Sequence, residues 1–163
     1  MAKKQTKLEL TWIGKGDDPK LEPRILIEDP AKRISVPVPA DGAATDDNLL
    51  IHGDNLLALK ALEQEYTGRI KCVYIDPPFN TGAAFEHSDD GIEHSIWLSL
   101  MNRRISLIHS LLHKSGSLFV HLDDNELDYF KVILDQVFGR KNFINRIILV
   151  PRPVSKIGHS AYL

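Results

Sequence analysis

A carboxylate followed by two prolines and an aromatic ring is the most distinctive chemical feature of this sequence. The four residues are Asp76, Pro77, Pro78 and Phe79. Each proline lacks an amide donor and fixes its own φ, so the turn offers a carboxylate and backbone carbonyls as acceptors on a rigid support. An aromatic ring beside such acceptors suits a nucleobase with an exocyclic amine. The turn therefore predicts a site that binds the exocyclic amine of a nucleobase.

Methylation of an adenine amine would need this kind of acceptor set. The amine lone pair is delocalised into the ring, so the nitrogen attacks well only as it becomes tetrahedral. Acceptance of one N–H by Asp76 and the other by the Pro77 carbonyl would favour that change and disperse the developing positive charge. Phe79 would stack on the base and hold it for in-line displacement. A base inside a duplex cannot reach such a pocket, so this chemistry requires base flipping.

Short apolar segments and helical segments alternate from Asn48 onward. Apolar periodicity predicts a helix between Asp54, its cap, and Gly68, and another over residues 94–112 that Ser115-Gly116 ends. A third helix, closed by Gly139, follows a possible capping box at 123–126. Strands are predicted at 49–52, 70–75, 117–122 and 143–150.

This alternation predicts an α/β fold, a doubly wound and mostly parallel sheet covered by helices. Ligands of such sheets bind beyond the carboxyl ends of the strands. Three of the predicted strands run directly into acids, so we expect a crevice lined with carboxylates. The acids are Asp54, Asp76, Asp123 and Asp124.

The remaining regions are less regular. Residues 1–47 hold most of the prolines and are predicted to form an irregular arm that ends in a linker at 41–47. Residues 48–150 form the predicted domain, and residues 151–163 are a tail of uncertain structure in a basic region that begins at Gln136. The tail could touch phosphate or could simply be solvated.

Composition limits the classes of protein. The 163 residues, of which 43% are apolar and 26% charged, fit one soluble domain. The net charge of -2 argues against a general polyanion-coating protein. No apolar run is long enough to span a membrane and none resembles a signal peptide, so a cytoplasmic location is expected. Cys72, the only cysteine, is predicted to be a buried apolar residue. The spacing of His52, His87 and His94 matches no metal-ligand pattern.

The segment from Asp76 to Gly82 resembles the catalytic signature of amino-directed DNA methyltransferases, in which tyrosine usually stands where this chain has Phe79. The order of further motifs resembles one subgroup, the modification (Mod) subunit of type III restriction-modification systems. The resemblance covers roughly residues 7–148. The matching segments are 8–15, 20–24, 48–59, 85–87, 94–98 and 123–126.

The resemblance implies methyl transfer from S-adenosylmethionine to the N6 amine of adenine in double-stranded DNA, by a partial Rossmann-like methyltransferase domain and without a metal. It implies that Asp54 contacts the adenine end of the cofactor, that Asp76 lies near its methionine end and the target base, and that Asn80 also binds the cofactor. Full-length members of the subgroup act with a restriction (Res) subunit and a second Mod copy.

One part of the family pattern does not match. The family places a glycine-rich cofactor turn, Phe-x-Gly-x-Gly, and its target-recognition region after the part seen here, and nothing in residues 83–163 fits that turn. The family-like pattern also fades after Val150. We therefore hypothesise a truncated or frame-shifted product that is inactive alone; downstream codons with no such turn in any frame would contradict this.

Other interpretations of the same residues stay open. The proline turn could merely end a strand, and Asp54, Asp123 and Asp124 could merely cap helices. Phe85 and Glu86 could contact a flipped base or only pack in their loop. A magnesium-dependent phosphoesterase using Asp54, Asp76 and Asp123 is one alternative function. A non-catalytic remnant or partner-binding module is another.

Overall fold

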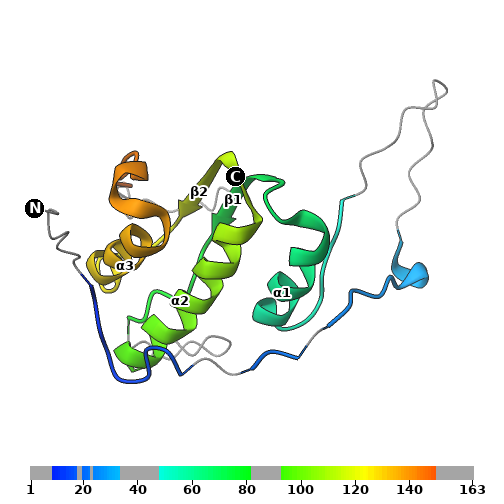
Figure 1. Ribbon diagram of the computed structural model, residues 1–163, viewed down its shortest axis with the longest axis horizontal. Helices are drawn as coiled ribbons and strands as arrows, with labels where there is room; N and C mark the ends of the chain where they lie inside the picture. Colours follow the sequence, from blue (N-terminus) through cyan, green and yellow to red (C-terminus); the bar gives the residue numbers. More distant parts are fainter. Residues whose placement is uncertain (1–8, 18–19, 23, 34–47, 82–92, 150–163) are drawn as a thin grey trace, which may run out of the picture.

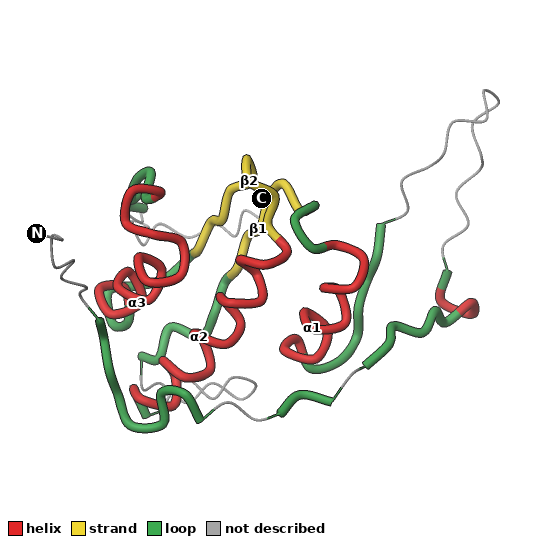
Figure 2. Tube along the Cα trace, in the orientation of Figure 1, coloured by secondary structure: helices red, strands yellow, loops and turns green. Residues whose placement is uncertain are grey.

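Helices pack beside a parallel pair of strands in the computed structural model of the protein (Figures 1 and 2). The structure describes residues 9–17, 20–22, 24–33, 48–81 and 93–149. Within these ranges the longer elements are α1 (Asn55–Tyr66), β1 (Ile70–Ile75), α2 (His94–Leu111), β2 (Leu112–Val120) and α3 (Leu127–Leu134). The short helical turns are η1 (Pro30–Lys32), η2 (Asp135–Gly139) and η3 (Arg140–Asn142). This arrangement confirms the predicted α/β class.

Helix α1 begins where the sequence predicts. Oδ1 of Asp54 accepts hydrogen bonds from the backbone N–H groups of Leu56 and Leu57, at 2.9 and 3.1 Å. These amides have no partner within the helix, so the carboxylate satisfies two of the first free donors. The cap role of Asp54 is therefore confirmed, and it leaves the second carboxylate oxygen available to another donor.

The two strands are parallel and in register at their carboxyl ends. Val73 pairs with Leu118 and Ile75 pairs with Val120, while α2 makes the crossover between the strands. Near the amino ends the register is irregular, because Ile70 pairs with Leu112 but Cys72 pairs with Ser117. Strand β2 therefore carries extra residues at this point.

Ser115-Gly116 lies in that irregular stretch and does not end α2 as predicted. The helix ends at Leu111, and β2 starts at the next residue. Gly116 lacks the positive φ of a helix-ending glycine. Its hydrogen in place of a side chain is needed for another reason, since a Cβ there would lie 2.7 Å from the carbonyl oxygen of Ile70. The dipeptide marks a close approach of backbones, which a sequence pattern does not distinguish from a helix end.

The core lies between α2, α3 and one face of the sheet. Trp97 and Ile105 of α2 and Ile133 of α3 are fully buried, and Trp97 meets Phe130 edge-to-face with centroids 5.6 Å apart. This confirms the predicted apolar stripe of α2. Val73, Ile75, Leu118 and Val120 of the strands pack against the same cluster.

The other face of the sheet is uncovered within the described residues. Tyr74 and Phe119 are neighbours across the two strands and are 66% and 49% exposed. Cys72 is also exposed, so the prediction that it is buried is wrong. It sits on the strand face that α2 and α3 do not cover, and an apolar run does not reveal which face is covered.

Two predicted strands are absent from the described residues. Residues 48–52 and 143–149 form no ladder, and Leu50 and Ile144 are 99% and 86% exposed. In this part of the chain β1 and β2 pair only with each other. An apolar segment becomes a strand only when its amide and carbonyl groups find a partner ladder, and composition alone does not supply one.

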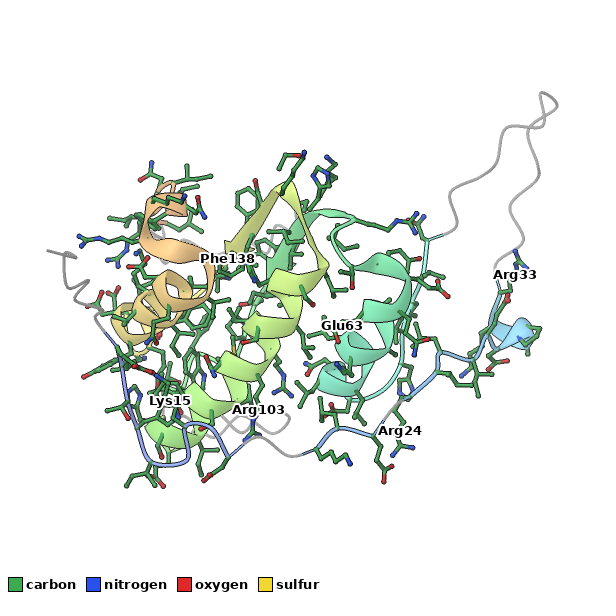
Figure 3. All side chains as sticks on the ribbon, in the orientation of Figure 1. Lys15, Arg24, Arg33, Glu63, Arg103 and Phe138 are labelled. Atoms are coloured by element: carbon green, nitrogen blue, oxygen red, sulfur yellow. The ribbon has the colours of Figure 1, made fainter. Side chains whose placement is uncertain are left out.

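Part of the N-terminal arm docks on α2. The indole Nε1 of Trp12 donates to Oγ of Ser99 at 2.8 Å, and Arg103 donates to the carbonyl oxygen of Asp17 at 2.5 Å. Lys15 lies over the ring of Trp12, 5.1 Å from its centroid. Figure 3 labels Lys15 on the arm and Arg103 on α2. The described arm is irregular apart from η1, as predicted.

Several predicted features lie outside the described residues. They are the linker at 41–47, the loop residues Phe85, Glu86 and His87, and the tail at 151–163. None of the described helices combines the length and apolar character that crossing a membrane requires.

Candidate active site

The proline turn follows β1 directly, at the carboxyl edge of the sheet. Asp76 is the first residue after β1, and His121 is the first residue after β2. The backbone N–H of His121 donates to the carbonyl oxygen of Ile75 at 3.0 Å, which extends the ladder by one bond. The paired strands therefore bring Asp76 and His121 side by side, at the edge where ligands of such sheets bind.

His121 contacts both ends of the turn. Its Nδ1 lies 3.3 Å from Oδ1 of Asp76, and its ring meets the ring of Phe79 edge-to-face at a centroid distance of 5.2 Å. The side chain of Asp76 is 57% exposed. An accessible carboxylate and an aromatic ring are thus held next to one imidazole. Sequence reasoning missed His121, because it lies inside the strand predicted at 117–122, whereas the observed strand ends at Val120.

Trp97 fixes the middle of the turn. Its indole Nε1 donates to the carbonyl oxygen of Pro78 at 2.8 Å. The expectation that the turn offers its backbone carbonyls to a ligand is therefore wrong for Pro78, because this carbonyl accepts from a side chain inside the protein. The reason is tertiary, since the partner comes from a helix that begins well after the turn.

Asn80 completes the turn in an unusual conformation. Its φ is 58°, the only positive value among the described residues other than glycine. Its Nδ2 donates to Oε1 of Glu126 at 2.6 Å. Nδ1 of His94 lies 2.9 Å from Oε1 and 2.8 Å from Oε2 of the same carboxylate, but only the first contact has hydrogen-bond geometry.

Asp123 and Asp124 do not form the predicted capping box. Oδ1 and Oδ2 of Asp123 accept from the backbone and side-chain nitrogens of Asn125, at 3.0 and 2.6 Å. Residues 124–126 form a turn, and Glu126 precedes α3 without a side-chain bond to the helix. The Glu126 carboxylate instead contacts Asn80 and His94, which are distant in the sequence. These contacts replace the bond to the helix start that a capping box would make.

Asp54 belongs to the same side of the molecule. The carboxyl end of α1 contacts the carboxyl end of α2, because Gly68 and Arg69 donate to carbonyls of Ser110 and Leu111. Helices α1 and α2 therefore run in the same direction, opposite to the strands (Figure 1). The start of α1, which Asp54 caps, therefore lies toward the end of the molecule at which the strands end.

Arg104 stands beside the start of α1. Its Nε donates to Oδ1 of Asn55 at 2.7 Å. Burial lowers the pKa of Arg104, and the negative charge of Asp54 opposes this shift. The guanidinium remains a cation at neutral pH.

The described residues contain no group of three acidic, histidine or cysteine side chains that could hold a metal ion. Asp54, Asp76 and Asp123 have separate partners, so the predicted crevice does not bring them together as a metal cluster. The phosphoesterase alternative has no supporting observation in this part of the chain. A shallow groove lined by Ile25, Leu26 and the second half of α1 lies apart from the proline turn.

Comparison with known proteins agrees with this geometry. A family model described as DNA methylase, N6_N4_Mtase, matches residues 70–161. Over 122 residues the chain is 38% identical to the probable type III restriction-modification enzyme HindVI Mod subunit of Haemophilus influenzae, covering 75% of this chain and 16% of that protein. Over 129 residues it is 33% identical to the StyLTI Mod subunit of Salmonella typhimurium, covering 62% and 20%. Over 173 residues it is 28% identical to the EcoP15I Mod subunit of Escherichia coli, covering 85% and 26%.

Proposed function

Since this chain belongs to the N6_N4_Mtase family of DNA methylases, we propose that it forms the amine-binding part of a DNA adenine-N6 methyltransferase of the type III modification kind. The chain spans between 16% and 26% of the length of the three Mod subunits compared above. The exposed carboxylate of Asp76, on a turn fixed at Pro78 and Asn80, is the observation that carries the proposal.

Asp76, Pro77 and Phe79 have complementary roles in this proposal. The Asp76 carboxylate and the Pro77 carbonyl accept the two N–H bonds of the base amine, and Phe79 stacks on the ring. S-adenosylmethionine supplies an electrophilic methyl group. The new N–C bond forms as the S–C bond breaks, and the surplus amine proton passes to Asp76. Because Asp76 is exposed, it can then release that proton to water.

The residues fit the base better than they fit the complete cofactor. One oxygen of Asp54 caps α1, and the other can accept a hydrogen bond from the adenosine part of the cofactor. Asp76 and Asn80 are the other proposed cofactor contacts. The Nδ2 of Asn80 is bonded to Glu126, so this bond fixes the side chain that we assign to the cofactor.

The proposed substrate is double-stranded DNA with a flipped adenine, and the proposed place of action is the cytoplasm. The relatives are Mod subunits of type III restriction-modification enzymes. We therefore propose that the complete protein acts with a restriction subunit and a second Mod copy.

Two assays test the proposal. The chain alone is irradiated with radiolabelled S-adenosylmethionine, and we expect labelling that Asp76→Ala abolishes. In parallel, residues 7–148 replace the matching segment of the Haemophilus influenzae subunit, and transfer of tritiated methyl groups to adenine in DNA is measured. Asp124→Ala, which removes an exposed acid outside the turn, is the matched control. Methylation by the Asp76→Ala chimera at the unmutated rate would overturn the proposal.

A partner-binding module is a second candidate, and the bare sheet face favours it. Parallel sheets are normally covered on both faces, whereas Tyr74 and Phe119 are exposed here. In this case the chain would associate with the rest of a methyltransferase without binding a base itself. Two results together would favour this candidate. The chain would not be labelled by radiolabelled S-adenosylmethionine, and it would associate stably with a fragment of the Haemophilus influenzae subunit that lacks the matching segment.

A further inference from the structure

Glu126 is a buried acid with partners from two distant segments. It is 2% exposed, and its Oε1 accepts from Asn80 at 2.6 Å and contacts Nδ1 of His94 at 2.9 Å. Its Oε2 is buried without a hydrogen bond among the described residues. Burying a carboxylate is costly, and an apolar side chain of similar size would fill the space at lower cost. Packing alone therefore does not explain an acid at this position.

Helix capping does not explain it either. The side chain of Glu126 makes no bond to the first turn of α3, and His94 begins α2 without receiving a side-chain cap from Glu93. The partner outside the helices is the proline turn. The carboxylate therefore joins the starts of two core helices to the last residue of that turn.

The backbone conformation of Asn80 indicates what its bond to Glu126 does. A φ of 58° lies in the left-handed region, which costs energy for residues with a side chain, although asparagine tolerates it better than most. The bond from Nδ2 to Glu126 holds the residue in this conformation. Trp97 holds the carbonyl two residues earlier, so Phe79 lies between two anchors.

We infer that Glu126 is a positioning residue that clamps the Asp76–Asn80 turn onto α2 and α3, and so sets where the Asp76 carboxylate meets a substrate amine. The inference rests on the proposed function for its catalytic consequence. Glu126 acts through Asn80 and does not itself touch the base. Its loss should therefore lower the turnover number of methyl transfer, and the conservative variant Glu126→Gln should restore it.

The two tryptophans of the chain allow a test without DNA or cofactor. In ¹H–¹⁵N spectra of the 163-residue chain, the Trp97 indole reports the turn through its bond to Pro78. The Trp12 indole reports the contact of the arm with Ser99 and serves as an internal control. We expect Glu126→Ala to shift or broaden the Trp97 signal and to leave the Trp12 signal in place. Glu126→Gln should restore the signal, because its amide oxygen still accepts from Asn80.

Two further variants guard against general unfolding. Asn80→Gly removes the amide but adopts the same φ freely, so it should reproduce the Trp97 change without disturbing a buried position. Glu93→Ala removes an exposed glutamate that also precedes a helix without capping it, and it should change neither signal. An unchanged Trp97 signal in both Glu126→Ala and Asn80→Gly would overturn the inference. So would parallel movement of both tryptophan signals, which indicates a general effect on folding.

The chimera described above separates this inference from the proposed function. If the unmutated chimera does not methylate DNA, the proposed function is wrong, while the spectra still decide whether Glu126 clamps the turn. If the unmutated chimera is active, Glu126→Ala should lower its turnover number at least tenfold and Glu126→Gln should restore it. A full turnover number in Glu126→Ala would overturn the catalytic part of the inference.

Discussion

Oδ1 of Asp76 lies 3.3 Å from Nδ1 of His121, and each residue directly follows one of the two paired strands. The imidazole also meets the edge of Phe79. One side chain thus contacts both the proposed amine acceptor and the proposed stacking ring. The acid and the ring are thereby held at a fixed separation by a residue from the neighbouring strand.

Replacing His121 with alanine should slow methyl transfer in the chimera by about tenfold, which corresponds to ~1.4 kcal/mol of transition-state stabilisation. The reason is that Asp76 and Phe79 lose a shared support while the acceptor atoms remain. Tritiated methyl incorporation into DNA is the measurement. His109→Ala is the matched control, because His109 also meets an aromatic ring edge-to-face, that of Phe138 at the other end of α2. Equal rates for the two variants would refute a role for His121.

The contact between Trp12 and Ser99 should stabilise the docked arm. We expect a double-mutant cycle of Trp12→Phe and Ser99→Ala to give a coupling of about 0.5–1.5 kcal/mol in the free energy of unfolding, the usual net value of one hydrogen bond. Urea denaturation provides the measurement. Ser106→Ala is the control, since Ser106, like Ser99, bonds a carbonyl four residues earlier but has no hydrogen bond to the described residues of the arm. Zero coupling would mean that the arm does not depend on this bond.

Gly116→Ala should destabilise the protein by about 1–3 kcal/mol, the usual cost of forcing extra atoms into a packed site. The added Cβ would lie 2.7 Å from the carbonyl oxygen of Ile70, where a backbone atom cannot easily move away. Thermal and urea unfolding measure the effect. Ser115→Ala, at the exposed neighbouring position, should change stability far less. Similar stabilities of the two variants would show that β2 shifts at its irregular stretch to make room for the added Cβ, and would contradict the prediction.

Glu63 should make stability depend on pH in the acid range. The bond from Lys60, and then the bond from Ser110, hold the pKa of this carboxyl below its ordinary value of 4.5. The unfolded chain therefore takes up the proton first as pH falls. The stabilisation is fully present above pH 4.5 and is lost as pH drops through the lower folded pKa. Figure 3 labels Glu63 on α1, the helix that Ser110 of α2 contacts through this bond.

Urea unfolding of Glu63→Gln at several pH values tests this. The variant should be less stable than the unmutated chain near neutral pH, and the difference should shrink on acidification. Glu65→Gln, an exposed change on the same helix, controls for the lost charge. A difference that grows as pH falls would contradict the assigned direction of the pKa shift.

The parts of the fold set by local pattern were predictable from the sequence. The apolar stripe of α2 and the cap of α1 at Asp54 occur where periodicity and residue type indicate. The likeness to type III Mod subunits is likewise confirmed. The strands predicted at 49–52 and 143–150 are absent from the described residues 49–52 and 143–149, because a strand depends on a partner that its own residues do not specify.

The supports of the candidate site were harder to predict. Asp76 and its prolines are contiguous, so their pattern is visible in the sequence. Trp97 and Glu126 contact the turn from distant positions, through an indole N–H and a carboxylate that also fit ordinary roles in a core or a cap. Their second role follows only from the way α2 and α3 pack against the sheet.

Trp97 is at once the largest fully buried side chain and the donor to the carbonyl of Pro78. The hydrophobic core and the proposed catalytic turn therefore both depend on the side chain of Trp97. On heating, enzyme activity should be lost at the same temperature at which the core unfolds. Damage to packing at Phe130, a core residue with no proposed role in binding the base, should consequently look like a catalytic defect in a screen that records only enzyme activity.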